Sequence, residues 1–202
     1  MNRRAQQKLQ GLAKREINYD PDGPHDSLDG WRHDLYRQTL GREAPGEPVE
    51  GGLFLGAQDL LRNYKVADPD LVEAIYDTEA PLEGRNMLLK LRFHKLFGVY
   101  GGCRVGPITD EVRQEEGKEA RVWGWPYMTL QGHVEQGEMN WEVWKWLESG
   151  VVEFRIHAFS RGASDGNPFV RLGFRLFGQR ERERYLNHAC ARMVEFTRRD
   201  TA

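Results

Sequence analysis

The spacing of apolar residues changes from a helical period to a strand period near residue 85. Between residues 53 and 61, apolar residues recur at steps of three and four: Leu53, Ala57, Leu60 and Leu61. This spacing predicts a helix. A second helix is predicted to begin at Asp68, an N-cap residue that is followed by Pro69. The apolar stripe of this second helix comprises Leu71, Val72, Ile75 and Tyr76.

From residue 86 onward apolar and polar residues alternate, which is typical of half-buried strands. Five strands are predicted in this region: 86–94, 97–105, 120–129, 140–147 and 151–160. One earlier strand is predicted at 31–40. Pro126 lies inside one of them and favours an edge, a bulge or a bend at that point. A long helix is predicted over Phe169–Arg199, where the apolar stripe is Tyr185, Leu186, Ala189, Met193 and Phe196.

The order of these elements is one strand, two short helices, about five antiparallel strands and a long C-terminal helix. Strands must bury one face, and the C-terminal helix is the natural cover for it. The sequence therefore predicts an α+β fold in which a curved antiparallel sheet wraps around the helix and leaves a cavity between them. Residues 1–29 are expected to form a polar N-terminal extension and loop, with an exposed helix over Asn2–Ile17. Residues 30–199 would form the domain.

Composition excludes several classes of partner. The chain has 202 residues and a formal net charge of −2, so there is no electrostatic reason to expect nucleic acid binding. Arginine and glutamate alternate over Arg180–Tyr185, which predicts a solvated helix face. Cys103 and Cys190 are far apart in a chain with a polar N-terminus, so we expect two reduced thiols in a cytoplasmic protein. No apolar run approaches the roughly 20 residues that would span a membrane.

The segment Met128–Trp141 holds a histidine and two carboxylates within a short distance: His133, Glu135 and Glu138. These residue types could bind a metal ion, but the paired histidines of the zinc helix signature are absent. The favoured interpretation is a polar loop at the rim of the sheet, with its carboxylates paired to Arg104 or Arg161. We therefore expect no metal and no cofactor. A loop of this kind also predicts that His133→Ala leaves folding nearly intact.

A second group of polar and aromatic residues lies on, or at the ends of, strands that should face the cavity. A mostly apolar pocket with a few convergent polar groups is the usual form of a ligand site. Together with the loop, the candidate ligand-binding residues are His33, Tyr36, Arg104, Trp125, Tyr127, Thr129, His133, Glu135, Glu138, Ser160 and Arg161. The alternative is structural: the arginines would form salt bridges, and the tryptophans would pack within the sheet.

Four segments carry a resemblance to a known family: Gly30–Arg42, Cys103–Val105, Thr129–Glu138 and His157–Arg161. In order and spacing these segments resemble uncharacterised protein family 0548. The resemblance extends over Asn18–Met193, and it implies the helix-grip fold of the START-like (SRPBCC) superfamily, which includes birch-pollen-allergen-like proteins and polyketide cyclases. The family carries no established activity, so the resemblance implies a fold rather than a reaction.

Three functions are compatible with such a scaffold. The favoured one is binding of a small, apolar or amphipathic molecule, or a lipid, in the cavity. The first alternative is a cavity enzyme, a cyclase, hydrolase or isomerase, with His33 or His133 as acid or base and Tyr36 or Tyr127 as partner. The second alternative is a protein-interaction module with a filled core and an exposed apolar patch. The ligand and the oligomeric state are not determined by the sequence.

Overall fold

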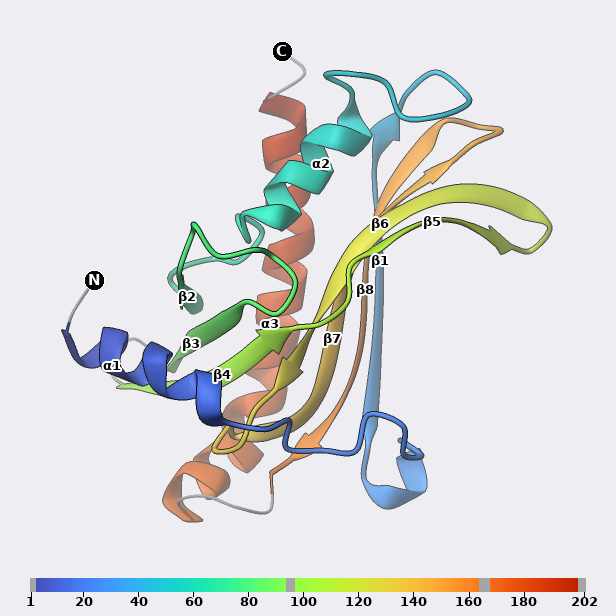
Figure 1. Cartoon of the computed structure of the whole chain (residues 1–202). Helices are drawn as coiled ribbons and strands as arrows, with labels where there is room; N and C mark the ends of the chain where they lie inside the picture. The colour runs from blue at the N-terminus through green and yellow to red at the C-terminus, as the bar shows by residue number, and fades with distance from the viewer. Residues whose placement is uncertain (1–2, 94–96, 164–167, 200–202) are drawn as a thin grey trace.

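The computed structural model describes residues 3–93, 97–163 and 168–199 (Figure 1). The helices are α1 (Arg3–Gly11), α2 (Leu53–Arg62) and α3 (Pro168–Arg199), with short 3₁₀ turns at Leu12–Lys14 and Ser27–Asp29. The strands are β1 (Arg32–Arg42), β2 (Val72–Tyr76), β3 (Asn86–Phe93), β4 (Phe97–Val105), β5 (Thr109–Glu115), β6 (Lys118–Thr129), β7 (Glu135–Trp146) and β8 (Val151–Gly162). The predicted α+β class is confirmed.

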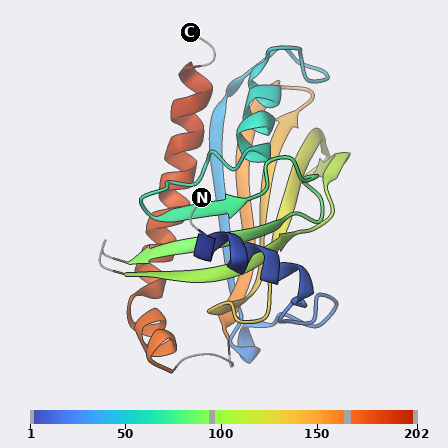
Figure 2. The same ribbon diagram turned by 60° about the vertical axis from the view of Figure 1, so that its left-hand side comes forward.

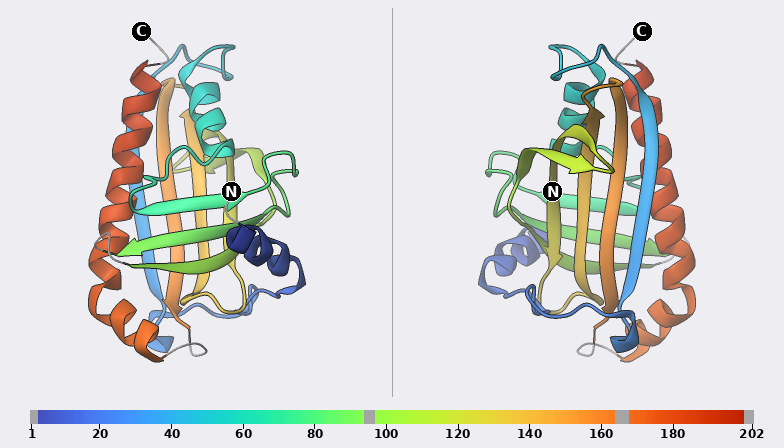
Figure 3. Two further views of the ribbon diagram at one scale, coloured as in Figure 1. Left: turned by 90° about the vertical axis from the view of Figure 1, so that its left-hand side faces the viewer. Right: turned by 90° about the vertical axis from the view of Figure 1, so that its right-hand side faces the viewer.

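The described strands form one antiparallel sheet in the order β1-β8-β7-β6-β4-β3-β2, and β5 pairs with β6 outside this path. The sheet curves around α3, which lies along its concave face, and α2 covers the same face at the far end (Figures 1 and 2). This is the helix-grip arrangement. Strands β2, β3 and β4 run across the long strands β1, β7 and β8, so they close one side of the space beneath α3 (Figure 3).

The core fills the space between the concave face and the helices. Alternate residues of β8 are fully buried there, namely Val152, Phe154, Ile156 and Ala158, as the period of two predicts. The facing stripe of α3 supplies Tyr185, Leu186, Ala189 and Met193, all of them buried. Burial of one apolar face on each element explains why strand and helix periodicities could both be recognised in the sequence.

The second predicted helix is wrong, because the segment after Asp68 forms only a turn followed by strand β2. The amides of Leu71 and Val72 donate to the carbonyl oxygen of Asp68, at 2.9 and 2.8 Å. Val72 then pairs with Leu91 of β3 in antiparallel register. A short apolar run fits a helix stripe or a buried strand equally well, and here the neighbouring strand decides between them.

The N-terminal helix is exposed along most of its length, but the segment contacts the sheet through two buried residues. Ala5 and Leu12 are buried against Leu88 and Leu130, on the face of the sheet opposite to α3. Arg104 holds this segment in place, since its Nη2 donates to the carbonyl oxygens of Leu12 and Arg15. The N-terminal segment therefore packs against the sheet (Figure 3).

Pro126 lies where the partner of β6 changes. Strand β5 pairs with β6 up to Gly124, and β4 pairs with it from Tyr127. Between these two partners, the carbonyl oxygen of Pro126 accepts a hydrogen bond from Gly106, at 2.9 Å. A proline cannot donate to a ladder, so the gap between two partner strands is a position that tolerates it. The register of β6 against β7 continues unbroken through Pro126, and β6 is a central strand, so Pro126 marks neither a bulge nor an edge strand.

A buried ion pair joins the end of β1 to β7 beneath α2. The Lys145 ammonium lies 2.6 Å from a carboxylate oxygen of Glu43, and the two side chains are 0% and 4% exposed. The other oxygen of Glu43 accepts from the amide of Phe54 in the first turn of α2. Glu43 therefore fixes the start of the helix and neutralises a lysine within the core.

Candidate functional site

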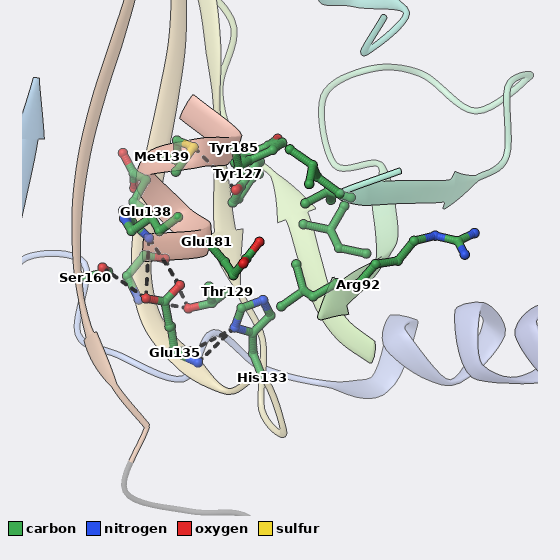
Figure 4. Close-up of a pocket in the computed structure, with 16 residues that line it drawn as sticks. Arg92, Tyr127, Thr129, His133, Glu135, Glu138, Met139, Ser160, Glu181 and Tyr185 are labelled. Atoms are coloured by element: carbon green, nitrogen blue, oxygen red, sulfur yellow. Dashed lines mark hydrogen bonds and ion pairs between the residues drawn. The ribbon is translucent and has the colours of Figure 1, made fainter. Parts of the chain in front are cut away.

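A cavity of about 80 Å³ lies between the concave face of the sheet and α3 (Figure 4). One wall is apolar and consists of Leu71, Val72, Leu89 and Leu91, whereas Met139 lies beside Glu138. The opposite wall is polar and consists of Thr129, His133, Glu135, Glu138, Ser160 and Arg182. Tyr127 and Tyr185 also line it. Six of the predicted ligand-binding residues are thus brought together: Tyr127, Thr129, His133, Glu135, Glu138 and Ser160.

The polar wall is built where β6 turns into β7, and the turn is shorter than predicted. Strand β6 ends at Thr129 and β7 begins at Glu135, so Glu138 lies within a strand. The predicted turn between the two strands is present at residues 130–134, but His133 is 5% exposed and lines the cavity, so it does not lie on an open rim. We now expect His133→Ala to lower the free energy of unfolding, since it would leave an unfilled space in the interior.

His133 is held by the backbone of β7 and by a close approach to β4. Its Nδ1 lies 3.0 Å from the amide nitrogen of Glu135 and 3.1 Å from the carbonyl oxygen of the same residue, so it accepts from the amide in one tautomer and donates to the carbonyl in the other. A Cβ atom at Gly101 would lie 2.2 Å from the imidazole ring, so only glycine leaves room for the ring there. Burial lowers the pKa of His133 below its ordinary value, although Glu135 opposes the shift. The imidazole is therefore neutral at neutral pH.

Arg182 of α3 is the buried cation of the polar wall, and Arg92 of β3 also lines the cavity. Arg182 is 8% exposed, its Nε donates to Asp34 at 2.7 Å, and its Nη1 donates to Glu135 at 3.1 Å. Burial acts to lower the pKa of Arg182, but the carboxylates of Glu135 and Asp34 reverse this effect and raise it. The expected pairing of Glu135 with Arg104 or Arg161 is therefore wrong. The prediction that Arg180–Tyr185 forms a solvated face is wrong at Arg182, because this side chain is buried.

Two further polar groups of the wall are bound to the N-terminal segment. Glu138 accepts a hydrogen bond from the hydroxyl of Tyr19, at 3.0 Å. The hydroxyl of Thr129 lies 2.6 Å from Oδ1 of Asn18 and accepts from the amide of Gly137, at 2.9 Å. Burial, and then Glu138, raise the pKa of Tyr19, so its hydroxyl stays protonated as the donor. The segment around Asn18 thus helps to fix the polar wall.

The tyrosines of the cavity are neutral donors with partners. Tyr127 donates to the sulfur of Met139 at 3.4 Å, and the hydroxyls of Tyr64 and Tyr185 lie 2.6 Å apart. Burial raises the pKa of Tyr127 and of Tyr185 above their ordinary values. A general base made from these phenols would need an ionised form that burial disfavours.

Five predicted ligand-binding residues lie elsewhere. His33 is exposed, and its Nε2 lies 2.7 Å from the carbonyl oxygen of His25. Tyr36 packs against the core, and Trp125 is buried within it. Arg104 binds the N-terminal segment as described above, and Arg161 bonds to Gln136 and lies 4.4 Å over the ring of Trp31. None of the five lines this cavity, and the two arginines bond to backbone carbonyl oxygens and side-chain amides, not to carboxylates.

The main residue that sequence reasoning missed is Arg182, and a signal for it was present. The apolar stripe of α3 includes Tyr185 and Leu186, and Arg182 lies three and four residues before them. Residues at these spacings share one helix face, so the stripe extends to Arg182. Its partner Asp34 is 148 residues away in the chain, which no local pattern indicates.

The lowered pKa of His133 predicts a pH dependence of stability. In the unfolded chain its pKa is near 6.5, so below this value the unfolded state binds protons first and the free energy of unfolding falls. His133→Asn keeps an oxygen that can accept from the amide of Glu135 but does not titrate. We expect the native protein to lose more stability than this variant between about pH 7.5 and about pH 5, by at most about 1.4 kcal/mol per pH unit. Urea unfolding at both values measures the difference, and equal losses would contradict the assignment.

The fold and the cavity define a helix-grip α+β protein with an internal site that is apolar on one side and polar on the other. Residues 18–185 match the family model described as Domain of unknown function (DUF1990), so the chain belongs to this family. In the described part of the chain, no group of three or more His, Cys, Asp and Glu side chains is arranged to hold a metal ion. None of the described helices is long and apolar enough to cross a membrane.

Two solved structures are similar in fold. The crystal structure of Ara h 8.0201 aligns with 83% of this chain and 98% of its own, at 8% identity and a TM-score of 0.45. The structure of an uncharacterized protein from Rhizobium leguminosarum aligns with 84% of this chain and 97% of its own, at 9% identity and a TM-score of 0.39. Comparison with curated proteins gave no match.

Proposed function

We propose that the protein binds a small, partly apolar molecule in the cavity between the sheet and α3. The observation that carries this proposal is the division of the cavity into an apolar wall and a polar wall (Figure 4). A site of this kind buries a hydrocarbon part against Leu89 and Leu91 and orients a polar end toward Glu135 and Arg182. The six predicted ligand-binding residues that line the cavity support binding of this kind.

The two alternative functions have less support. In the described residues, the hydrogen bonds of His133 go to the backbone of Glu135 and not to a carboxylate or tyrosine side chain, so an acid–base pair is not assembled. The exposed large apolar side chains of the described residues are scattered over separate segments: Leu28, Leu35, Val49, Leu55 and Val112. A protein-interaction face would gather such side chains into one patch.

Native mass spectrometry of the purified protein, followed by denaturing extraction, tests the proposal directly. We expect a mass above that of the chain and a released molecule with both apolar and polar groups. Leu91→Trp should remove the extra mass, because the larger side chain would occupy the cavity that Leu91 lines. Leu35→Trp is the control, since Leu35 is 60% exposed and does not line the cavity. If the extra mass persisted in Leu91→Trp, the bound molecule would lie elsewhere.

The family resemblance and the cysteines give two further lines of support for this proposal. The resemblance to uncharacterised protein family 0548 and to START-like (SRPBCC) proteins supports a scaffold suited to ligand binding, although fold does not fix function. The reduced thiols inferred for Cys103 and Cys190, both buried, support a cytoplasmic site of action.

A further inference from the structure

We infer that the molecule held in this cavity presents a neutral hydrogen-bond acceptor, such as a ketone, ester or amide carbonyl, to Arg182 and His133. The inference deepens the proposed function and rests on it. Two observations carry it: hydrogen-bond donors of the polar wall that lack an acceptor, and an excess of carboxylates around them.

The first donor without an acceptor is Nη2 of Arg182. The guanidinium uses Nε on Asp34 and Nη1 on Glu135, whereas Nη2 is buried and has no partner among the described residues. A buried donor that lacks an acceptor costs free energy, so native structures rarely keep one without a reason. An oxygen supplied by a bound molecule would satisfy this nitrogen.

The second donor is Nε2 of His133, in one tautomer of the imidazole. In the tautomer in which Nδ1 accepts from the amide of Glu135, the proton of the neutral imidazole is on Nε2, whereas in the other tautomer Nδ1 donates to the carbonyl oxygen of Glu135. Nε2 has no partner among the described residues either, and His133 lines the same cavity as Arg182 (Figure 4). Glu135 is bonded to both residues: its backbone bonds to the imidazole of His133, and its carboxylate accepts from the guanidinium of Arg182. The polar wall therefore holds two residues that can donate to a bound molecule, Arg182 and His133.

The charge around these donors disfavours an anion. Among the described residues, two guanidiniums line the cavity: that of Arg182 is already paired with Asp34 and Glu135, and that of Arg92 with Glu73. The carboxylates of Glu138 and Glu181 also line the cavity. A bound carboxylate would add a further negative charge to this cluster, at a cost that burial increases. A cation would offer no acceptor to either donor and would lie beside the guanidinium of Arg182. A neutral acceptor can accept hydrogen bonds from these donors and adds no negative charge to the cluster.

The size of the cavity limits the rest of the molecule. Its volume of about 80 Å³ is small, because usual ligand pockets measure roughly 300–1,000 Å³. A compact apolar group attached to the carbonyl would contact Leu89 and Leu91. A longer molecule would need α3 or β2 to move away from the sheet.

Three probes of nearly equal shape test the inference: acetophenone with a neutral carbonyl, benzoate with an anion, and ethylbenzene with no acceptor. We expect acetophenone to bind at least about tenfold more tightly than either of the others, as expected for a hydrogen bond to a charged donor. Titration followed by amide NMR signals of Glu135 and Gly137 measures all three affinities. Equal binding of benzoate or of ethylbenzene would overturn the inference and leave the proposed function standing. If none of the three bound, the proposed function would fail together with the inference.

A charge variant tests the reason for the selectivity. Glu135→Gln removes one negative charge but keeps an oxygen that accepts from Arg182, so benzoate affinity should rise about tenfold while that of acetophenone changes little. Glu111→Gln is the matched control, because Glu111 is exposed on β5 and pairs with Arg113 outside the cavity. If Glu135→Gln still preferred acetophenone over benzoate by the same factor, the excess of carboxylates would not be the cause of this preference.

Discussion

Replacing Lys145 with methionine is expected to lower the free energy of unfolding by about 3–5 kcal/mol, the usual cost of removing one partner from a buried ion pair. The variant would leave the carboxylate of Glu43 in the core without its cation, since the lysine is 0% exposed and lies 2.6 Å from it. The carbonyl oxygen of Glu47, which accepts from the ammonium at 2.9 Å, would also lose its donor. Urea denaturation followed by tryptophan fluorescence measures the loss.

Two variants serve as controls for this result. Adding Glu43→Gln to Lys145→Met removes both charges and keeps an oxygen that accepts from Phe54, so it should recover most of the lost stability. Arg37→Met breaks an exposed ion pair with Glu115 and should change the free energy of unfolding by less than about 1 kcal/mol. A single Lys145→Met variant as stable as Arg37→Met would contradict the assigned role of the buried pair.

Gly137→Ala is expected to lower the free energy of unfolding by about 3 kcal/mol, because backbone strain and a steric clash act together. Gly137 lies in β7 with φ of +140°, a conformation that side chains disfavour. Its new Cβ atom would lie 2.1 Å from the carbonyl oxygen of Phe159 in β8, where the backbone cannot give way without loss of pairing. The same residue lines the cavity and donates to Thr129, so ligand binding should weaken as well.

Gly162→Ala is the matched control for this substitution. Gly162 is paired at the far end of β8, and a Cβ atom added there meets nothing within 4 Å. We expect a change of less than about 1 kcal/mol in the free energy of unfolding. Similar losses in both variants would show that replacement of any strand glycine, and not the geometry at Gly137, causes the effect.

The architecture could be predicted because each element buries one face with its own period. The alternation along β8 and the stripe around Tyr185 in α3 are local features, and burial against a partner preserves them. The same reasoning failed at Val72–Tyr76, where the apolar residues fit a helix stripe but pair with β3 as a strand. Local spacing does not distinguish these cases when the run is short.

The candidate site was predicted only in part, because its members are joined by long-range contacts. Residues near the turn from β6 to β7, including Thr129, His133 and Glu135, were recognised since they are neighbours in the chain. His33 was misplaced, because the register of β1 against β8 places it on the outer face opposite Phe159 and not toward the cavity. A shift by one residue reverses the face of a strand, and the sequence pattern there does not fix that choice.

The sequence by itself determined the class of fold, the long C-terminal helix and the polar turn between β6 and β7, because these depend on periodicity and on neighbouring residues. Tertiary structure decided which charges belong to the site. Arg182 alternates with glutamates and looks solvated, yet it is buried because Asp34 and Glu135, from two distant strands, converge on its guanidinium. Only folding brings these three side chains together, and their hydrogen bonds offset the cost of burying the charge.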